Sequence, residues 1–337
     1  FYSNISKYEN LKWDNYLGLI KIKNIDKSNN GIEIVIYENY KVAQNPEITL
    51  EANPDDLSEE YLIELSKIGI NRLSIGIQSF FEDDLAMMNR AHNSVEAQKC
   101  LELATQYFDN ISIDLIYGVP GMSNAQWQQN IETALRFGVP HISSYALTVE
   151  PKTALNTLIQ KGKIDAPKDE VAEAHFQILV ETLEKNGFIH YELSNFGKEN
   201  YFSKNNSAYW LGKKYIGIGP SAHSYDGISR SWNVANNALY LKAIQQNQLP
   251  NEKEILSTAD RYNEYIMTGL RTIWGVALDR IEREFGLDYL DYLIKQSEKF
   301  VKDELLAIEN NILKPTSKGK FLTDGIASDL FYINSEE

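Results

Sequence analysis

RLSIGIQSF (residues 72–80) and NISIDLIYGVP (residues 110–120) are two runs of β-branched and apolar residues, separated by SVEAQKCLELATQYF (94–108). Within the intervening segment, apolar side chains recur at the spacing of a helix, so the three segments predict a strand, a helix and a second strand. Two parallel strands need a crossover of this kind, and it is right-handed in nearly all known folds. This unit therefore predicts a parallel sheet.

The same alternation continues on both sides of that unit. The further segments, in chain order, are ITLEA (48–52), SEEYLIELSKIG (58–69), NAQWQQNIETALRFG (124–138), HISSYALTVE (141–150), EVAEAHFQILVETLEKNG (170–187) and FIHYELSNF (188–196). Repeated strand and helix segments predict an α/β fold with parallel strands. We expect a partial (β/α) barrel of the TIM type.

After residue 200 the pattern changes to loops rich in Gly, Ser, Asn and aromatic residues, with one short strand predicted at KYIGIG (214–219). From about residue 255 the chain is predicted to be helical, and it ends in a hairpin that pairs ILKPT (312–316) with KFLT (320–323). These segments predict a small, mainly helical, winged-helix-like domain. The expected domains are 1–250 for the barrel with its following loops and 251–337 for the C-terminal domain.

Composition limits the partners of the chain. Its 337 residues carry a formal net charge of -14, which repels phosphate backbones and excludes nucleic acid as a general partner. No uninterrupted apolar run is long enough for a transmembrane segment, and FYSNISKYENLKWDNY at the start has no apolar core of a secretory signal. The single cysteine, Cys100, lies on the apolar side of a predicted helix and is interpreted as a core thiol. We therefore expect a protein of the reducing cytoplasm.

Polar residues occur at the ends of three successive predicted strands. Glu51 lies within the first strand, Gln78 ends the second, and Asp114 lies in the third. Ligands of parallel α/β folds bind at the carboxyl ends of the strands, so the three side chains together indicate a common polar ligand. For Glu51 a buried structural hydrogen bond is the alternative. A lone arginine such as Arg90 is ordinarily an exposed helix cation.

The remaining motifs give weak signals. The five histidines are scattered without metal-ligand spacing, and no nucleophile elbow of the form GxSxG occurs. GIGPSA (217–222) has the spacing of a dinucleotide motif but opens no helix of a βαβ unit, so we reject that site. His175 is interpreted as structural, whereas His223 is the better candidate ligand because glycine and proline fix its loop.

Several strings resemble one known family, in order, from about Ile36 to Phe331. They are LEANPDDLS (50–58), NRLSIGIQSF (71–80), NISIDLIYGVPG (110–121), ISSYALTVEPKT (142–153), YWLGKKYIGIGPSAHSY (209–225), SWNVANNALYL (231–241) and LTDGIASDLF (322–331). These strings are similar to the HemW-type heme chaperone branch of the oxygen-independent coproporphyrinogen III oxidases, in the radical S-adenosylmethionine (SAM) family. The resemblance implies a partial TIM barrel that holds SAM and a [4Fe-4S] cluster.

The resemblance also assigns residues. Glu51, Gln78, Arg90 and Asp114 match the SAM-contacting positions of the family, and Ala146 matches a backbone contact. Carboxylates suit the ribose hydroxyls and the amino group of SAM, and arginine suits its carboxylate.

Two family elements are not found in the sequence. The CxxxCxxC loop, whose thiolates bind the cluster, and the GGGTP strand end have no counterpart, and Phe1 resembles the residue just after that loop. We therefore expect that the chain lacks segments of the family and that no cluster ligand lies in it. A cluster-free relative is the alternative.

A third departure concerns heme. The chaperone branch carries HNxxYW, but Asn205 stands here at the histidine position, and His223 is the substitute candidate for a heme ligand. The function implied by the resemblance is a chaperone that binds heme and delivers it to recipient proteins. The alternatives are a coproporphyrinogen III oxidase, which decarboxylates a porphyrinogen by radical chemistry, and a cluster-free scaffold without catalysis.

Overall fold

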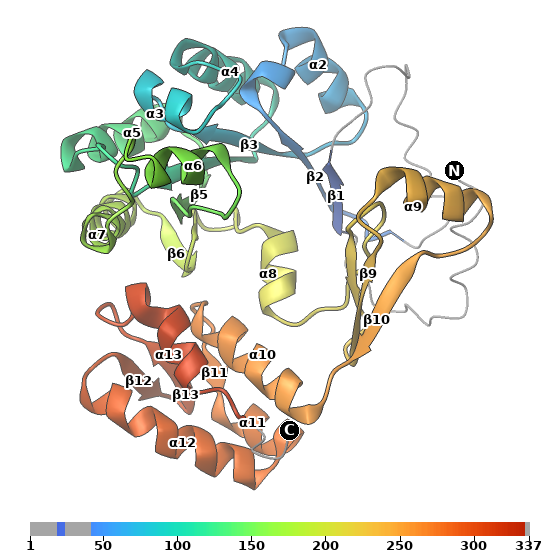
Figure 1. The fold of residues 1–337 in the computed structure, drawn as a ribbon, viewed down its shortest axis with the longest axis vertical. Helices are drawn as coiled ribbons and strands as arrows, with labels where there is room; N and C mark the ends of the chain where they lie inside the picture. Colours follow the sequence, from blue (N-terminus) through green and yellow to red (C-terminus); the bar gives the residue numbers. More distant parts are fainter. Residues whose placement is uncertain (1–18, 24–41, 334–337) are drawn as a thin grey trace. The chain divides into compact units, whose positions relative to one another are not determined.

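The computed structural model describes residues 19–23 and 42–333, so Phe1 lies outside the described residues (Figure 1). The contacts divide the chain into two compact units. The first unit contains the strand Leu19–Lys23 and residues 47–203, and the second contains residues 204–333. The domain boundary near residue 250 stays a prediction.

The first unit is built on a sheet of seven strands in the order β1-β2-β3-β4-β5-β7-β6. Its strands are β1 (Leu19–Lys23), β2 (Glu47–Ala52), β3 (Arg72–Gln78), β4 (Ile111–Tyr117), β5 (His141–Ala146), β6 (Ile189–Glu192) and β7 (Asn195–Gly197). Each of the strands β1 to β5 pairs in parallel with the next. The predicted parallel α/β architecture is thus confirmed for this part of the sheet.

The prediction that FIHYELSNF (188–196) forms one more parallel strand is wrong. The segment folds back on itself, and β7 pairs antiparallel with both β5 and β6. The carboxylate of Glu192 holds the turn, since it accepts hydrogen bonds from the backbone N–H of Ser194 (3.2 Å) and from the side chain of Asn195. Among the described strands, the sheet is consequently mixed and open, with β1 and β6 at its edges.

Helices connect the strands of the first unit. They are α2 (Glu59–Lys67), α3 (Glu82–Met87), α4 (Ser94–Tyr107), α5 (Asn124–Arg136), α6 (Ala154–Gln160) and α7 (Asp169–Lys185), with a 3₁₀ turn, η2 (Pro54–Asp56), after β2. Capping boxes at Asn93 and Ser123 fix where α4 and α5 begin, since each side chain accepts hydrogen bonds from free N–H groups of the first turn. Cys100 of α4 is buried, and desolvation raises the pKa of its thiol to about 12, which confirms the predicted core thiol.

Trp127 joins α5, α7 and the end of β4. Its indole is fully buried and donates a hydrogen bond to the backbone oxygen of His175 (2.8 Å). The imidazole of His175 accepts a hydrogen bond from the backbone N–H of Gly118 (3.1 Å), directly after β4. His175 is therefore a structural residue, as predicted.

His141 makes stability depend on pH. It is fully buried at the start of β5, with Nδ1 2.7 Å from Ser112 Oγ and Nε2 2.7 Å from Tyr191 Oη. Burial, and then the positive charge of Arg72, hold the pKa of this imidazole well below its usual 6.5. The unfolded chain therefore takes up a proton that the folded chain does not, and stability is lost as the pH falls below 6.5.

We expect this histidine to contribute a loss of about 1.4 kcal/mol of unfolding free energy per pH unit below that point. His141→Gln should flatten the pH dependence of stability by this amount, although it lowers stability at neutral pH. Urea unfolding at pH 7.5 and 5.5 gives the change in unfolding free energy with pH for each protein. The titration of carboxylates contributes equally to both proteins, so it cancels when the two changes are subtracted. Equal slopes for the two proteins would contradict the prediction.

The second unit begins with α8 (Lys204–Trp210) and an antiparallel sheet of the order β10-β9-β8, with α9 (Asn237–Gln245) between β9 and β10. The strands are β8 (His223–Tyr225), β9 (Ser229–Asn233) and β10 (Asn251–Ile255). The strand predicted at KYIGIG is wrong, because only Tyr215 forms an isolated bridge, with Tyr225. Gly217 lies close to the backbone of His223, because a Cβ added to residue 217 would be 2.2 Å from the backbone oxygen of His223.

The C-terminal part of this unit has the predicted winged-helix-like order. It contains α10 (Thr258–Leu270), β11 (Val276–Ala277), α11 (Leu278–Phe285), α12 (Leu287–Lys302), β12 (Leu306–Glu309), β13 (Ile312–Pro315), the 3₁₀ helix η3 (Lys320–Leu322) and α13 (Thr323–Asp329). The predicted hairpin is misplaced, because β13 pairs with β12 and KFL forms η3. Asn310 (φ 50°) and Asn311 (φ 64°) form the tight turn between β12 and β13.

Among the described residues, no helix combines the length and the apolarity needed to cross a membrane.

Candidate functional site at the strand ends

The register of the sheet gathers polar side chains on one face. Glu51 pairs with Ser74, Ser74 with Ser112, and Asp114 with Ser143. Paired residues point to the same side, as do residues two apart on one strand, so these five residues share a face, here called the polar face. The residues between them point to the other side and are buried apolar groups, among them Leu50, Leu73, Ile113 and Ile142. The polar face therefore presents two carboxylates, Glu51 on β2 and Asp114 on β4, with β3 between them.

Tyr145 follows Ser143 by two residues and extends the polar face at the end of β5. Its ring is 44% exposed. Desolvation of its hydroxyl, and then the negative charges of Asp114 and Glu192, raise the pKa of Tyr145 to about 12, with a smaller contribution from Glu51. The hydroxyl of Tyr145 thus lies among carboxylates from three strands. The sequence did not identify Glu192 as a neighbour of this hydroxyl.

Gly76 provides a cradle next to the polar face. It follows Ser74 by two residues, and a Cβ on Gly76 would lie 2.9 Å from Gln78 Nε2, 3.2 Å from Arg90 Nη2 and 3.6 Å from Asn53 Oδ1. Only a residue without a side chain leaves room for those three polar groups to converge. The structure therefore brings Gln78 and Arg90 together, although twelve positions separate them in the sequence.

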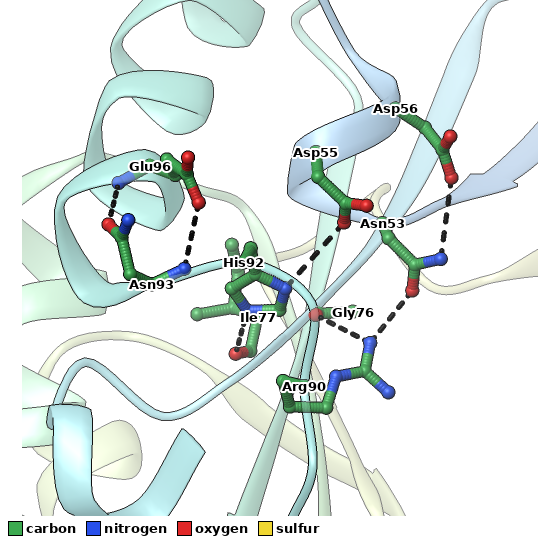
Figure 2. A network of polar contacts seen from close by, with 9 residues as sticks. All are labelled: Asn53, Asp55, Asp56, Gly76, Ile77, Arg90, His92, Asn93 and Glu96. Atoms are coloured by element: carbon green, nitrogen blue, oxygen red, sulfur yellow. Dashed lines mark hydrogen bonds and ion pairs between the residues drawn. The ribbon is translucent and has the colours of Figure 1, made fainter. Parts of the chain in front are cut away.

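Arg90 is held in this position by polar contacts (Figure 2). Its Nη2 donates hydrogen bonds to Asn53 Oδ1 (2.7 Å) and to the backbone oxygen of Gly76 (3.4 Å). Asn53 in turn donates to a carboxylate oxygen of Asp56 (3.4 Å). Arg90 is accordingly a positioned cation at the end of β3 rather than a freely exposed helix residue.

His92 anchors the loop that carries Arg90. Its Nε2 lies 3.1 Å from the backbone oxygen of Ile77, and its Nδ1 lies 3.9 Å from a carboxylate oxygen of Asp55 (Figure 2). Burial lowers the pKa of His92, partly offset by the Ile77 hydrogen bond. The burial of His92 depends on contacts with residues distant in the sequence, so no local pattern indicates it.

Gln78 has an unusual backbone. Its φ is 67°, and the pairing of β3 with β4 shifts its register between Ile75 and Gln78. A bulge of this kind turns the end of a strand and changes where the side chain points. It places the Gln78 amide beside Arg90.

The other two predicted residues lie apart from this cluster. Ala146 pairs with Tyr117 and has the opposite orientation to Tyr145, so its backbone but not its methyl group is available on the polar face. His223 lies in the second unit, exposed on β8, with its ring 6.1 Å from that of Trp232. Asn205 lies on α8 of the same unit.

A cluster site is not formed by the residues present. No group of three His, Cys, Asp or Glu side chains in residues 42–333 is arranged to hold a metal ion. Three thiolates are needed for the cluster, whereas the sequence contains one cysteine, whose buried thiol has a raised pKa. The polar face and the Gly76 cradle, in contrast, suit a zwitterionic ligand with hydroxyl groups.

Comparisons with known proteins agree with this fold. Residues 11–134 match the Radical SAM superfamily model, and residues 256–322 match the HemN C-terminal domain model. The structure of coproporphyrinogen III oxidase (HemN) from Escherichia coli, a radical SAM enzyme, superposes with a TM-score of 0.74 at 21% identity. That match covers 88% of this chain and 72% of the other, and it shows the shared fold. The fold and the two family models thus define a protein of the radical SAM class.

The nearer sequence relatives are heme chaperones. The heme chaperone HemW of Bacillus subtilis is 36% identical over 279 residues, which cover 82% of this chain and 73% of the relative. HemW of Mycobacterium tuberculosis is 30% identical over 301 residues, covering 88% and 74%. The chain belongs to the HemW heme chaperone family of radical SAM proteins.

Proposed function

We propose that this chain binds heme and delivers it to recipient proteins, and that it binds SAM at the strand ends of its first unit. The chaperone role is supported by the HemW relatives, which are similar over most of the chain. The oxidase alternative has less support, because the structural match to HemN at 21% identity shows only a common fold. A cytoplasmic location, proposed here as well, is supported by a single, buried cysteine.

The SAM site is supported by the Gly76 cradle. We assign Arg90 to the carboxylate of the methionine part, which a guanidinium binds with two parallel hydrogen bonds. The Gln78 amide lies next to it, and the carboxylates of Glu51 and Asp114 suit the amino group and the ribose hydroxyls. Ala146 is assigned a backbone contact. SAM supplies radical chemistry in this superfamily when a [4Fe-4S] cluster holds it, and the residues present here fit SAM but not the cluster.

Heme titration tests the chaperone proposal. The purified chain is expected to bind hemin with saturation at a fixed stoichiometry and to release it to an apo-protein acceptor, without consuming coproporphyrinogen. The Soret absorption band measures binding and transfer. Non-saturable binding, or conversion of coproporphyrinogen by the chain, would exclude a pure chaperone role.

Arg90→Lys is expected to weaken SAM binding about tenfold, because lysine keeps the charge but cannot form the two-pronged contact. Isothermal titration calorimetry with SAM measures the affinity. Arg136→Lys is the control. Within residues 42–333 this arginine of α5 donates a hydrogen bond only to Oγ1 of Thr133, so the variant should leave SAM affinity unchanged. Equal SAM affinity of the Arg90→Lys variant and the unaltered chain would remove Arg90 from the site.

A further inference from the structure

The second unit contains a cavity of about 510 Å³ that is open to solvent on one side. Its lining comes from α8 and the residues after it, from β8, β9 and β10, and from α10 and α11, so six elements of this unit surround it. The volume lies in the range of small-molecule and cofactor sites. The strand-end site does not account for this cavity, whereas Tyr209 and Trp210 of its wall are the last two residues of the segment that matches HNxxYW.

Aromatic rings form much of the wall. Tyr209 and Tyr215 meet edge to face with centroids 4.5 Å apart, and Tyr215 lies 6.0 Å from Tyr225. On the α10 side, the guanidinium of Arg280 stacks over the ring of Tyr265 at 4.1 Å. Rings that pack on one another in this way are fixed in orientation and offer flat apolar surfaces to a ligand. The walls therefore suit a planar ring system.

Two of the three arginines in the wall are neutralised by partners. Arg230 Nη2 lies 2.6 Å from Glu264 Oε1, and Arg280 Nε lies 3.1 Å from Glu284 Oε2. Desolvation raises the pKa of Glu264, which shows that its ion pair with Arg230 lies in a partly water-excluded place. These two arginines form ion pairs within the wall, and the partner carboxylates offset the positive charge that they would offer a ligand.

Arg261 is different. It makes no ion pair with any residue in 42–333, and its one side-chain hydrogen bond, to Thr258 Oγ1, is 3.5 Å long. Its Nε is buried without a hydrogen-bond partner, as is the indole Nε1 of Trp210 in the same wall. Buried N–H donors without an acceptor cost free energy, and the terminal nitrogens of Arg261, which among the described residues make only the 3.5 Å bond, can bind the acidic oxygens of a ligand.

We propose that this cavity binds the heme, with the tetrapyrrole against the aromatic wall and a propionate on Arg261. The inference rests on the proposed chaperone function and adds the place of binding and the group recognised. A propionate carboxylate supplies the acceptor that Arg261 lacks, and the porphyrin supplies the planar surface that the aromatic wall fits. His223 does not line this cavity, so the structure assigns recognition to the ring faces and to Arg261 rather than to that histidine.

The proposal is tested by comparing the affinities of hemin and hemin dimethyl ester, in which the propionates are blocked. Both ligands are titrated into the unaltered chain and into Arg261→Met. The unaltered chain is expected to bind hemin about tenfold more tightly than the ester, which is the loss typical of removing one charge-assisted hydrogen-bond pair. Arg261→Met should lose about tenfold in hemin affinity and bind the ester unchanged. Ester binding by the variant shows that the cavity is still folded.

Two further variants complete the test. Arg283→Met removes an exposed arginine that pairs with Glu284 on α11, and it should retain the full preference for hemin. Arg261→Lys keeps the charge and should retain part of the preference, which separates a lost ion pair from a misfolded wall. If the unaltered chain binds hemin and Arg261→Met keeps the full preference, the cavity is not the heme site. If the unaltered chain binds no hemin, the proposed chaperone function itself fails.

Discussion

Gly76→Ala is expected to weaken SAM binding on the order of a hundredfold while the protein stays folded. The added methyl group would lie 2.9 Å from Gln78 Nε2 and 3.2 Å from Arg90 Nη2. Both atoms are ends of flexible side chains, so these side chains move away and the backbone of β3 stays in place. Two assigned SAM contacts are then lost at once, whereas the unfolding free energy changes by about 1 kcal/mol or less.

SAM titration calorimetry and thermal unfolding of the same preparation measure the two effects separately. Gly325→Ala is the matched control, because its Cβ would meet no atom within 4 Å and the residue lies in α13 of the other unit. That control should keep full SAM affinity. If Gly76→Ala binds SAM as well as the unaltered chain, the SAM site does not include the Gly76 cradle.

Trp127→Ala is expected to lower the unfolding free energy of the first unit by about 3–5 kcal/mol. The indole is fully buried, and its ring lies 5.7 Å from that of Tyr117 and 5.9 Å from that of His175. Its removal leaves a cavity among α5, α7 and β4 and frees the backbone oxygen of His175. Urea unfolding followed by circular dichroism measures the loss.

Trp127→Phe separates the two contributions. Phenylalanine fills most of the space but cannot donate the 2.8 Å hydrogen bond to His175, so about 1–2 kcal/mol should be lost. Trp232→Ala, which removes a half-buried tryptophan of β9, should cost clearly less than Trp127→Ala. Equal losses for Trp127→Ala and Trp232→Ala would show that burial of Trp127 does not determine the stability of the first unit.

The parallel part of the fold could be predicted because each strand and helix carries its own local pattern. The alternation from residue 48 to 187 predicted β2 to β5 and the helices α2, α4, α5 and α7, but not the short helices α3 and α6. The strand-end rule selected Gln78 and Asp114 without any structure. The hairpin of β6 and β7 could not be predicted this way. Its turn depends on the Glu192 carboxylate, whose contacts with Ser194 and Asn195 leave no periodic signal.

The C-terminal hairpin shows a signal that was present but overlooked. Asn310 and Asn311 are adjacent residues that tolerate a positive φ, and two such residues between apolar runs are typical of a hairpin turn. The preceding DELLAI was interpreted as helical because Glu and Leu favour helices, and pairing with β13 overrides that preference.

The sequence indicated some residues of the candidate site, among them Gln78 and Arg90, but not its geometry. Nothing in the sequence indicates that Asn53, Gly76 and Arg90 meet, since the meeting depends on a loop anchored by the buried His92. The proximity of Glu192 to Tyr145 likewise arises from the fold-back of β7, which the sequence reasoning missed.

The backbone conformation of Gln78 lowers the stability of the fold, whereas its side chain is an assigned contact to the ligand. A side chain in the left-handed region costs on the order of 1 kcal/mol, and glycine would adopt φ 67° without that cost. Glycine would also remove the amide that lies beside Arg90. The residue that gives the highest folding stability at position 78 is therefore not the residue that gives the strongest ligand binding. Substitutions that raise heat resistance by removing backbone strain should leave Gln78 unaltered.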